Sequence, residues 1–260
     1  MSGHDVAIAG IAYWSRGLPS WAAARDYALG GEAVADAPAR PSPQLLPANE
    51  RRRAPETVAV ALDVALAACQ AADRDPAELP SVFASAHGDM AITDYMCQTL
   101  AADPRALSPI RFHNSVHNAA AGYWTIGAGC MRAATAICAE RASFAQGLIE
   151  ALAQLAEGSE AVLLVGYDGP SAGPLSAITP SEDLLGGALL LSRAANTSAP
   201  RLRARLDEGA ADAGGALTRR LSGNAMATML PLFDALATGA AQVRLDAGSG
   251  RALVVELTHG

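Results

Sequence analysis

Three histidines are the side chains in this chain whose type and spacing best suit proton transfer or metal binding. His87 follows a short apolar segment, and His113 and His117 lie four residues apart in the polar run 108–118. A histidine at such a place can act as a general base, and three together can bind a metal ion. However, Ser115 is typical of a helix N-cap, so a helix is expected to begin between His113 and His117 and to separate them. We therefore expect no metal site.

Cys138 is the cysteine best placed for nucleophilic catalysis, because it lies near the end of an apolar segment and just before a predicted helix. A catalytic thiol needs a base beside it, and the neighbouring Ile137 and Ala139 supply none. The other three cysteines form no CxxC pair, so we interpret all four as reduced thiols. No G-x-G-x-x-G motif follows the first predicted strand, and we expect the protein to use no cofactor.

The composition places the chain among soluble, well-buried α/β proteins. Of its 260 residues, 51% are hydrophobic and 17% are charged, and the net charge is −7. Such an acidic chain lacks the basic face that nucleic-acid binding needs. No apolar segment is long enough to span a bilayer without an interrupting charge or glycine, and the amino-terminal residues do not resemble a signal peptide. We expect a cytoplasmic protein without a membrane span or a nucleic-acid partner.

Apolar segments typical of buried strands alternate with amphipathic helices over most of the chain. Strands are predicted over 5–12, 81–86, 133–139, 160–168 and 186–192, and helices over 21–29, 56–72, 92–101, 115–127 and 142–157. Three consecutive strand–helix units predict a mostly parallel sheet between helices. Ligand sites in such folds lie at the carboxyl ends of strands, which here carry His87, Glu140–Arg141 and Tyr167–Asp168.

The end of the chain changes character. Residues 169–183 are predicted to form a loop, 201–206 a strand with one solvated face, and 207–226 a mobile loop. Pro231 begins a short helix that ends at Gly239, and the remaining residues follow a hairpin pattern. No linker divides the chain, so we expect residues 1–260 to form a single domain.

The runs HNSVHNAAAGYWTIGAG at 113–129 and ASFAQGLIEALAQLAEGSEAVLLVGYD at 142–168 resemble the amino-terminal half of β-ketoacyl-carrier-protein synthases. Weaker matches extend the resemblance over 5–193, with 194–260 as a short strand, helix and hairpin extension. It implies an α/β, thiolase-like half fold. Within the family, the chain most resembles the chain-length-factor-like proteins of aryl polyene-type polyketide pathways.

The departures from the family pattern bear on activity. Counting from Gly122, the nucleophile of the synthases falls on Arg141, and a guanidinium stays protonated and cannot attack a thioester. The two catalytic histidine motifs of the family are also absent. The resemblance therefore implies a subunit with no catalytic residue that pairs with an intact β-ketoacyl synthase and shapes its acyl tunnel. Such a subunit would meet acyl carrier protein through the complex, in polyketide or fatty-acid-type biosynthesis.

The resemblance also assigns roles to individual residues. The positions expected to line or gate the tunnel are His87, Arg111, Ser115 and Val116. Those expected at the subunit interface are His113, His117, Asn118, Gly122, Tyr123 and Trp124. From the residues alone, an ordinary buried helix with hydrogen-bonded histidines is the alternative interpretation of the same segment.

Two other functions remain open at this stage. In a free-standing enzyme, His113 or His117 would act as the base and Arg141 would bind a carboxylate or phosphate. In a homodimeric carrier-binding module, the run Arg51–Arg53 would contact an acidic carrier protein.

Overall fold

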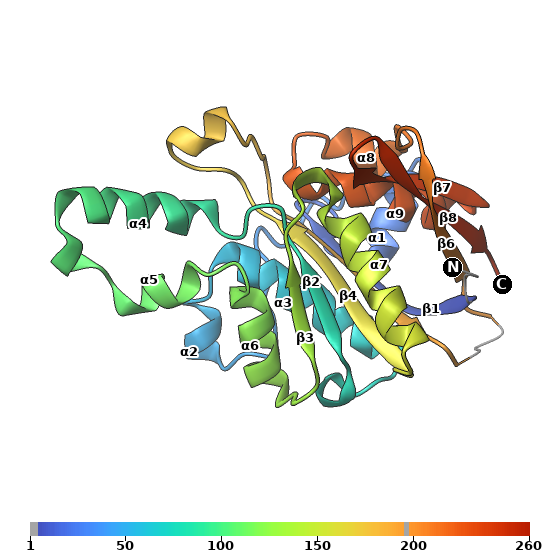
Figure 1. Cartoon of the computed structure of the whole chain (residues 1–260), viewed down its shortest axis with the longest axis horizontal. Coiled ribbons are helices and arrows are strands. Elements are labelled where there is room, and N and C mark those ends of the chain that lie inside the picture. The colour runs from blue at the N-terminus through green and yellow to red at the C-terminus, as the bar shows by residue number, and fades with distance from the viewer. Residues whose placement is uncertain (1–4, 195–197) are drawn as a thin grey trace.

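The computed structural model describes residues 5–194 and 198–260, and its strands form one eight-stranded sheet (Figure 1). The strand order is β3-β2-β4-β5-β1-β6-β8-β7, so β3 and β7 lie at the two edges. The strands are β1 Val6–Ser15, β2 Ser81–Ala84, β3 Ala134–Ile137, β4 Ala161–Asp168, β5 Leu185–Ser192, β6 Arg201–Glu208, β7 Gln242–Gly248 and β8 Arg251–Thr258.

Strand direction divides this sheet into two parts. β2 pairs in parallel with β3 and with β4. β5 pairs antiparallel with both β4 and β1, and the pairs that join β6, β8 and β7 are antiparallel as well. The predicted mostly parallel sheet is therefore wrong, and the sheet is mixed. The reason is the connection from β4 to β5, a loop over 169–184 without a crossover helix, which returns the chain beside β4 in the opposite direction.

Helices cover both faces of the sheet. They are α1 Trp21–Ala28, α2 Ala48–Arg51, α3 Glu56–Ala71, α4 Met90–Ala102, α5 Pro109–Asn114, α6 Ala119–Ala128, α7 Ser143–Ala156, α8 Ala216–Arg220 and α9 Leu230–Thr238. Short 3-10 turns are η1 Pro76–Glu78, η2 Pro104–Ala106, η3 Glu140–Ala142, η4 Pro174–Ala177 and η5 Ala225–Met229. None of the helices in the described ranges combines the length and apolarity needed to cross a bilayer.

The core is split in two by the alternation of side chains along the central strands. In β4, Val162 and Leu164 point to the side of α7 and α9, whereas Leu163 and Val165 point to the side of α3 and α6. Every residue of β4 is buried, as expected for a strand with helices on both faces. The long apolar run that predicted β4 is thus a direct consequence of its central place.

The segment that contains α4 and α5 extends away from the sheet as an arm (Figure 1). α4 begins at Met90, with the Asp89 carboxylate accepting a hydrogen bond from the Ile92 N–H, and buries only Met90 and Met96 among its residues. A helix with so little buried surface depends for its stability on its neighbour α5 or on contacts with another molecule.

Two predicted local features are wrong. Ser115 does not cap a helix start: its hydroxyl donates to the Phe112 carbonyl at the end of α5, and α6 begins only after Asn118. The segment 207–226 is not a mobile loop, because it contains α8 and the start of η5. The buried Asp234 carboxylate, distant in sequence, accepts hydrogen bonds from the N–H groups that begin α8.

Candidate functional site

The carboxyl ends of β2, β3 and β4 lie together and carry the polar residues of the candidate site. Parallel pairing brings these ends to one edge of the sheet. At the β3 end, the Cys138 thiol donates to the Ala86 carbonyl at 3.2 Å, and at the β4 end the Asp168 carboxylate contacts the turn after β2. The structure thus brings together the strand ends that the sequence identified.

Asp168 holds the centre of this edge. Its fully buried carboxylate accepts hydrogen bonds from the Ser85 hydroxyl at 2.7 Å, the Ala86 N–H at 2.8 Å and the His87 N–H at 3.2 Å. Burial raises the pKa of Asp168 to about 7, and the three donors, which favour the charged form, oppose that rise. The residue therefore fixes the turn after β2 that carries His87.

The two histidines near this edge are held differently. Burial lowers the pKa of the half-buried His87 imidazole, whereas the backbone of Ala86 and the Glu140 carboxylate act in the opposite direction. His117 places Nε2 at 2.9 Å from the Ser85 carbonyl oxygen, and because a carbonyl only accepts, Nε2 carries the proton. His117 is thereby anchored to the end of β2, and only its Nδ1 remains as an acceptor.

A sharp turn follows β3 at the position where the family pattern places the nucleophile. Glu140 has φ 49°, in the left-handed region that non-glycine residues rarely adopt. The Ser143 hydroxyl secures this turn, accepting from the Ala139 N–H at 2.9 Å and donating to the Glu140 carbonyl at 2.7 Å. The strained residue is therefore Glu140, one position before Arg141, whose side chain is 79% exposed and paired with Asp246 at 3.3 Å.

Two candidate nucleophiles near this edge are held by backbone carbonyls. The thiol of Cys138 donates to the Ala86 carbonyl, and among the described residues no base is its hydrogen-bond partner. Residues 169–173 read GPSAG, which has the GxSxG spacing of a nucleophile elbow. Its Ser171 bonds through both N–H and hydroxyl to the Ser181 carbonyl, in a loop followed by η4 rather than an α-helix, so it does not form a nucleophile elbow.

The predicted interface residues fall into exposed and buried groups. His113 and Asn118 are exposed, and Gly122 is half-buried. The Tyr123 hydroxyl donates to the buried Asn114 side chain at 3.0 Å. Trp124, in contrast, is fully buried, with its ring 6.3 Å from that of Phe83, so its side chain belongs to the core of this chain.

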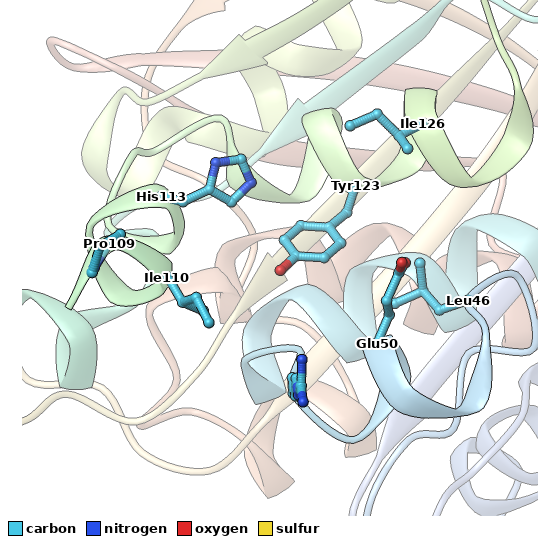
Figure 2. A pocket seen from close by; sticks show the side chains of 8 residues that line it. Leu46, Glu50, Pro109, Ile110, His113, Tyr123 and Ile126 are labelled. Carbon is cyan, nitrogen blue, oxygen red and sulfur yellow. The ribbon is translucent and has the colours of Figure 1, made fainter.

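Two cavities flank α5, and most of the residues that line them were not predicted from the sequence as site residues. A cavity of about 440 Å³ lies between α2, α5 and α6; Figure 2 shows its lining. It is lined by Leu46, Glu50, Arg53, Pro109, Ile110, His113, Tyr123 and Ile126. A second, of about 590 Å³, lies between α5, the start of α4 and the start of α3. The apolar pair Leu45–Leu46 within a proline-rich loop was the signal in the sequence that this loop folds back over the helices.

The structure does not bring together the histidines and Arg141 that the free-standing enzyme would need in one site. His113 lines the cavity beside α6, whereas Arg141 lines a different cavity of about 240 Å³ beside β7 and η5. His117 is bound to the end of β2. Within the described residues, no group of three or more potential metal ligands is close enough to hold an ion.

The raised pKa of Asp168 predicts a stability that falls as pH rises. Between the ordinary aspartate pKa near 4 and about 7, the folded protein binds a proton that the unfolded chain does not. The stabilisation is complete below about pH 4 and is lost as pH rises through about 7, a change on the order of 4 kcal/mol. Urea unfolding at several pH values should show this slope in the wild type. If Asp168→Asn had the same slope, the assignment to Asp168 would be wrong.

Comparisons with known proteins assign this chain to a family. A family model described as the β-ketoacyl synthase N-terminal domain matches residues 21–251. Among solved structures, a chain in the ketosynthase (ApeO) in complex with its chain length factor (ApeC) from Xenorhabdus doucetiae aligns with a TM-score of 0.77 and 21% identity, over 98% of this chain and 99% of that chain. A search of curated proteins finds no match.

Two further solved structures show the same fold over nearly equal lengths. One is AntDE:AntF, a type II PKS acyl-carrier protein in complex with its ketosynthase bound to the hexaketide, with a TM-score of 0.74, 11% identity and full coverage of both chains. The other is the ishigamide ketosynthase/chain length factor, with a TM-score of 0.69 and 16% identity, over 98% of this chain and 99% of that one. The predicted thiolase-like half fold is confirmed. Because the family model spans most of the sequence, the chain belongs to the β-ketoacyl synthase N-terminal domain family.

Proposed function

We propose that this chain is a non-catalytic, chain-length-factor-like subunit that pairs with an intact β-ketoacyl synthase and helps to wall its acyl tunnel. The complex acts in cytoplasmic polyketide or fatty-acid-type biosynthesis, with an aryl polyene pathway as the specific assignment, and receives its substrates from acyl carrier protein. In this proposal residues 1–260 form one ketosynthase-like domain, with 194–260 as its extension.

The turn after β3 is the observation that carries the proposal. A condensing enzyme needs a thiolate there, and this chain presents Glu140 in the strained position with Arg141 beside it. Neither side chain can form an acyl thioester, and the nearby Cys138 thiol donates a hydrogen bond to the Ala86 carbonyl oxygen. A protein that keeps the fold without the nucleophile is suited to complete a partner's site.

Exposed apolar surface beside an unpaired strand supports a subunit partner. On α5, α6 and the segments that follow them, Phe112, Val116, Ile126 and Met131 are 60%, 47%, 77% and 95% exposed; we call these four residues the α5–α6 surface. Of these elements, α6 contacts β3, an edge strand whose outer side has no partner strand among those described. Exposed apolar groups and an open strand edge are typical of surfaces that another protein covers.

Three of the four proposed tunnel residues lie in α5 or directly after it, and the fourth, His87, follows β2. His87 is positioned by Asp168 at the end of β2, and Val116 belongs to the α5–α6 surface. Arg111 stacks over the Tyr95 ring at 4.0 Å, and Ser115 lies between α5 and His117. We propose that these four residues face the partner's acyl chain and that their bulk and polarity limit its length by excluding longer products.

Co-expression with a candidate full-length ketosynthase tests the proposal. We expect a one-to-one complex in which elongation of a carrier-bound acyl chain needs both subunits. Replacing the partner's catalytic cysteine should abolish elongation, whereas Cys138→Ala in this chain should leave it unchanged. Covalent acylation and elongation by this chain alone, or failure of every candidate partner to co-purify, would refute the proposal.

A further inference from the structure

A third cavity lies beside the turn that follows β3. It has a volume of about 240 Å³ and lies between η3, β7, η5 and the segment 211–213, which precedes α8. Among the described residues, none lines both this cavity and a cavity at α5. Sites for drug-sized ligands begin at roughly 300 Å³, so this volume suits a ligand of a few non-hydrogen atoms. We call it the η3 cavity.

One wall of the η3 cavity is a segment that is fastened to β7. The Asp212 N–H donates to the Arg244 carbonyl at 2.9 Å, and Asp212 Oδ2 accepts from the Arg244 N–H at 2.9 Å. The Arg244 guanidinium donates to the carbonyls of Ala210 and Glu208. Residues 210–215 have no regular secondary structure, yet these bonds hold Asp212 at a fixed place beside β7.

Unused charged groups of both signs line this one cavity. Arg141 places Nε at 3.3 Å from Asp246 Oδ2, and its two terminal nitrogens have no partner among the described residues. Asp246 is engaged through both oxygens, because Oδ1 accepts from the Gly248 N–H at 3.0 Å. Asp212 Oδ1, in contrast, has neither a hydrogen bond nor an ion pair within the described ranges.

The rest of the wall combines free hydroxyls with small side chains. Ser222 and Thr228 line the cavity, and neither hydroxyl has a hydrogen-bond partner in the part of the chain that the structure describes. Ala211, Ala213 and Ala227 contribute only methyl groups. A ligand with polar groups therefore finds partners on several sides, whereas a long apolar ligand has little surface against which to be buried.

From these unused groups we infer that the η3 cavity binds a small α-amino acid with a hydroxyl-bearing side chain. Its carboxylate pairs with the terminal nitrogens of Arg141, because a guanidinium matches a carboxylate through two parallel hydrogen bonds. Its ammonium group, which only donates, pairs with Asp212 Oδ1, and its hydroxyl reaches Ser222 and Thr228.

The charges of the wall favour a zwitterion over a simple ion. The cavity is lined by one guanidinium and two carboxylates, those of Asp212 and Asp246. A simple anion is repelled by both carboxylates, and a simple cation is repelled by Arg141, whereas an amino acid brings each of its charges to the opposite one. Binding is non-covalent and uses residues of this chain alone, so it goes beyond the subunit role proposed above and does not depend on it.

Titration of the isolated full chain with L-serine, followed by amide chemical shifts in NMR spectra, tests this inference. Two probes each lack one charge of serine: 2-aminoethanol has no carboxylate, and 3-hydroxypropanoate has no ammonium group. We expect saturable shifts with serine at the residues of the η3 cavity. Each truncated probe should bind at least about tenfold more weakly, since a charge-assisted hydrogen bond contributes on that scale. A truncated probe that binds as tightly as serine would overturn the inference.

Two conservative variants assign each charge of the ligand to its partner. Arg141→Gln should weaken serine binding about tenfold and remove the preference for serine over 2-aminoethanol, because the carboxylate loses its partner. Asp212→Asn should likewise weaken serine binding about tenfold and remove the preference for serine over 3-hydroxypropanoate. Both side chains are exposed, and asparagine still accepts from the Arg244 N–H, so neither change removes a buried contact.

Matched controls change the net charge by the same amounts outside the cavity. Arg219, in α8, and Glu208, at the end of β6, are exposed and do not line it. Arg219→Gln and Glu208→Gln should leave the affinity for serine unchanged, and urea unfolding of all four variants checks that each is folded. Equal weakening by the controls, or no saturable shift with serine, would overturn the inference and leave the proposed pairing with a ketosynthase intact.

Discussion

Replacing Asp168 by alanine is expected to lower the free energy of unfolding by roughly 3–5 kcal/mol, because three buried donors lose their acceptor at once. The Ser85 hydroxyl and the N–H groups of Ala86 and His87 all point at this carboxylate, which is shielded from water. Urea unfolding at pH 6 measures the change. Hydrogen exchange of the turn after β2 should rise more than exchange within α3, because the turn loses its anchor directly.

A half-buried aspartate at the surface supplies the comparison for this variant. Asp246 is paired with the exposed Arg141, and exposed ion pairs contribute about 1 kcal/mol or less. Its other oxygen accepts a hydrogen bond from the Gly248 N–H at 3.0 Å, so Asp246→Ala should cost about 1–2 kcal/mol, less than Asp168→Ala. If Asp168→Ala cost no more than Asp246→Ala, the carboxylate would not be the anchor of the β2 turn.

The strands and helices that sequence reasoning predicted correctly are those whose pattern reflects local burial. α3 shows apolar residues at helical spacing because it packs on β1, β4 and β5, and β4 is uniformly apolar because it is covered on both faces. The convergence of His87, Glu140 and Asp168 was also predictable, because neighbouring parallel strands bring their carboxyl ends to one edge.

The features that sequence reasoning missed depend on contacts between distant residues. The order around α8 comes from Asp234, which lies far along the chain from the N–H groups that it accepts from. Nothing in the local pattern of 207–226 specifies that partner. The direction of β5 follows from the β4–β5 loop, and an apolar run has the same composition in a parallel and an antiparallel sheet.

The site shows the same division. Counting residues from Gly122 placed the nucleophile position on Arg141. The residue with the strained, positive φ is Glu140, one position earlier, and a residue count contains no information on backbone dihedral angles. Ser115 was assigned to a helix start from its residue type, yet α5 ends there. The serine that caps a helix start in this segment is Ser108, whose hydroxyl accepts from the Arg111 N–H.

Placing a charge on the α5–α6 surface is expected to abolish pairing with a ketosynthase. The double variant Phe112→Asp, Met131→Asp introduces two carboxylates that pairing would bury without partners. Because central interface residues contribute about 2 kcal/mol or more each, the dissociation constant should rise by at least roughly 100-fold. Both side chains are exposed in the isolated chain, so its own free energy of unfolding should change by about 0.5 kcal/mol or less per site.

Leu29→Asp is the matched control for this variant. Leu29 is 61% exposed at the end of α1, and α1 packs on the opposite face of the sheet from α6. The same kind of substitution there should leave the complex intact, because an aspartate that stays in water carries no desolvation cost. Analytical ultracentrifugation of each variant mixed with the partner, together with urea unfolding of each variant alone, separates lost pairing from lost folding. A double variant that pairs as tightly as the wild type would exclude the α5–α6 surface as the contact, since two buried, unpaired carboxylates cannot be accommodated in an interface without loss of affinity.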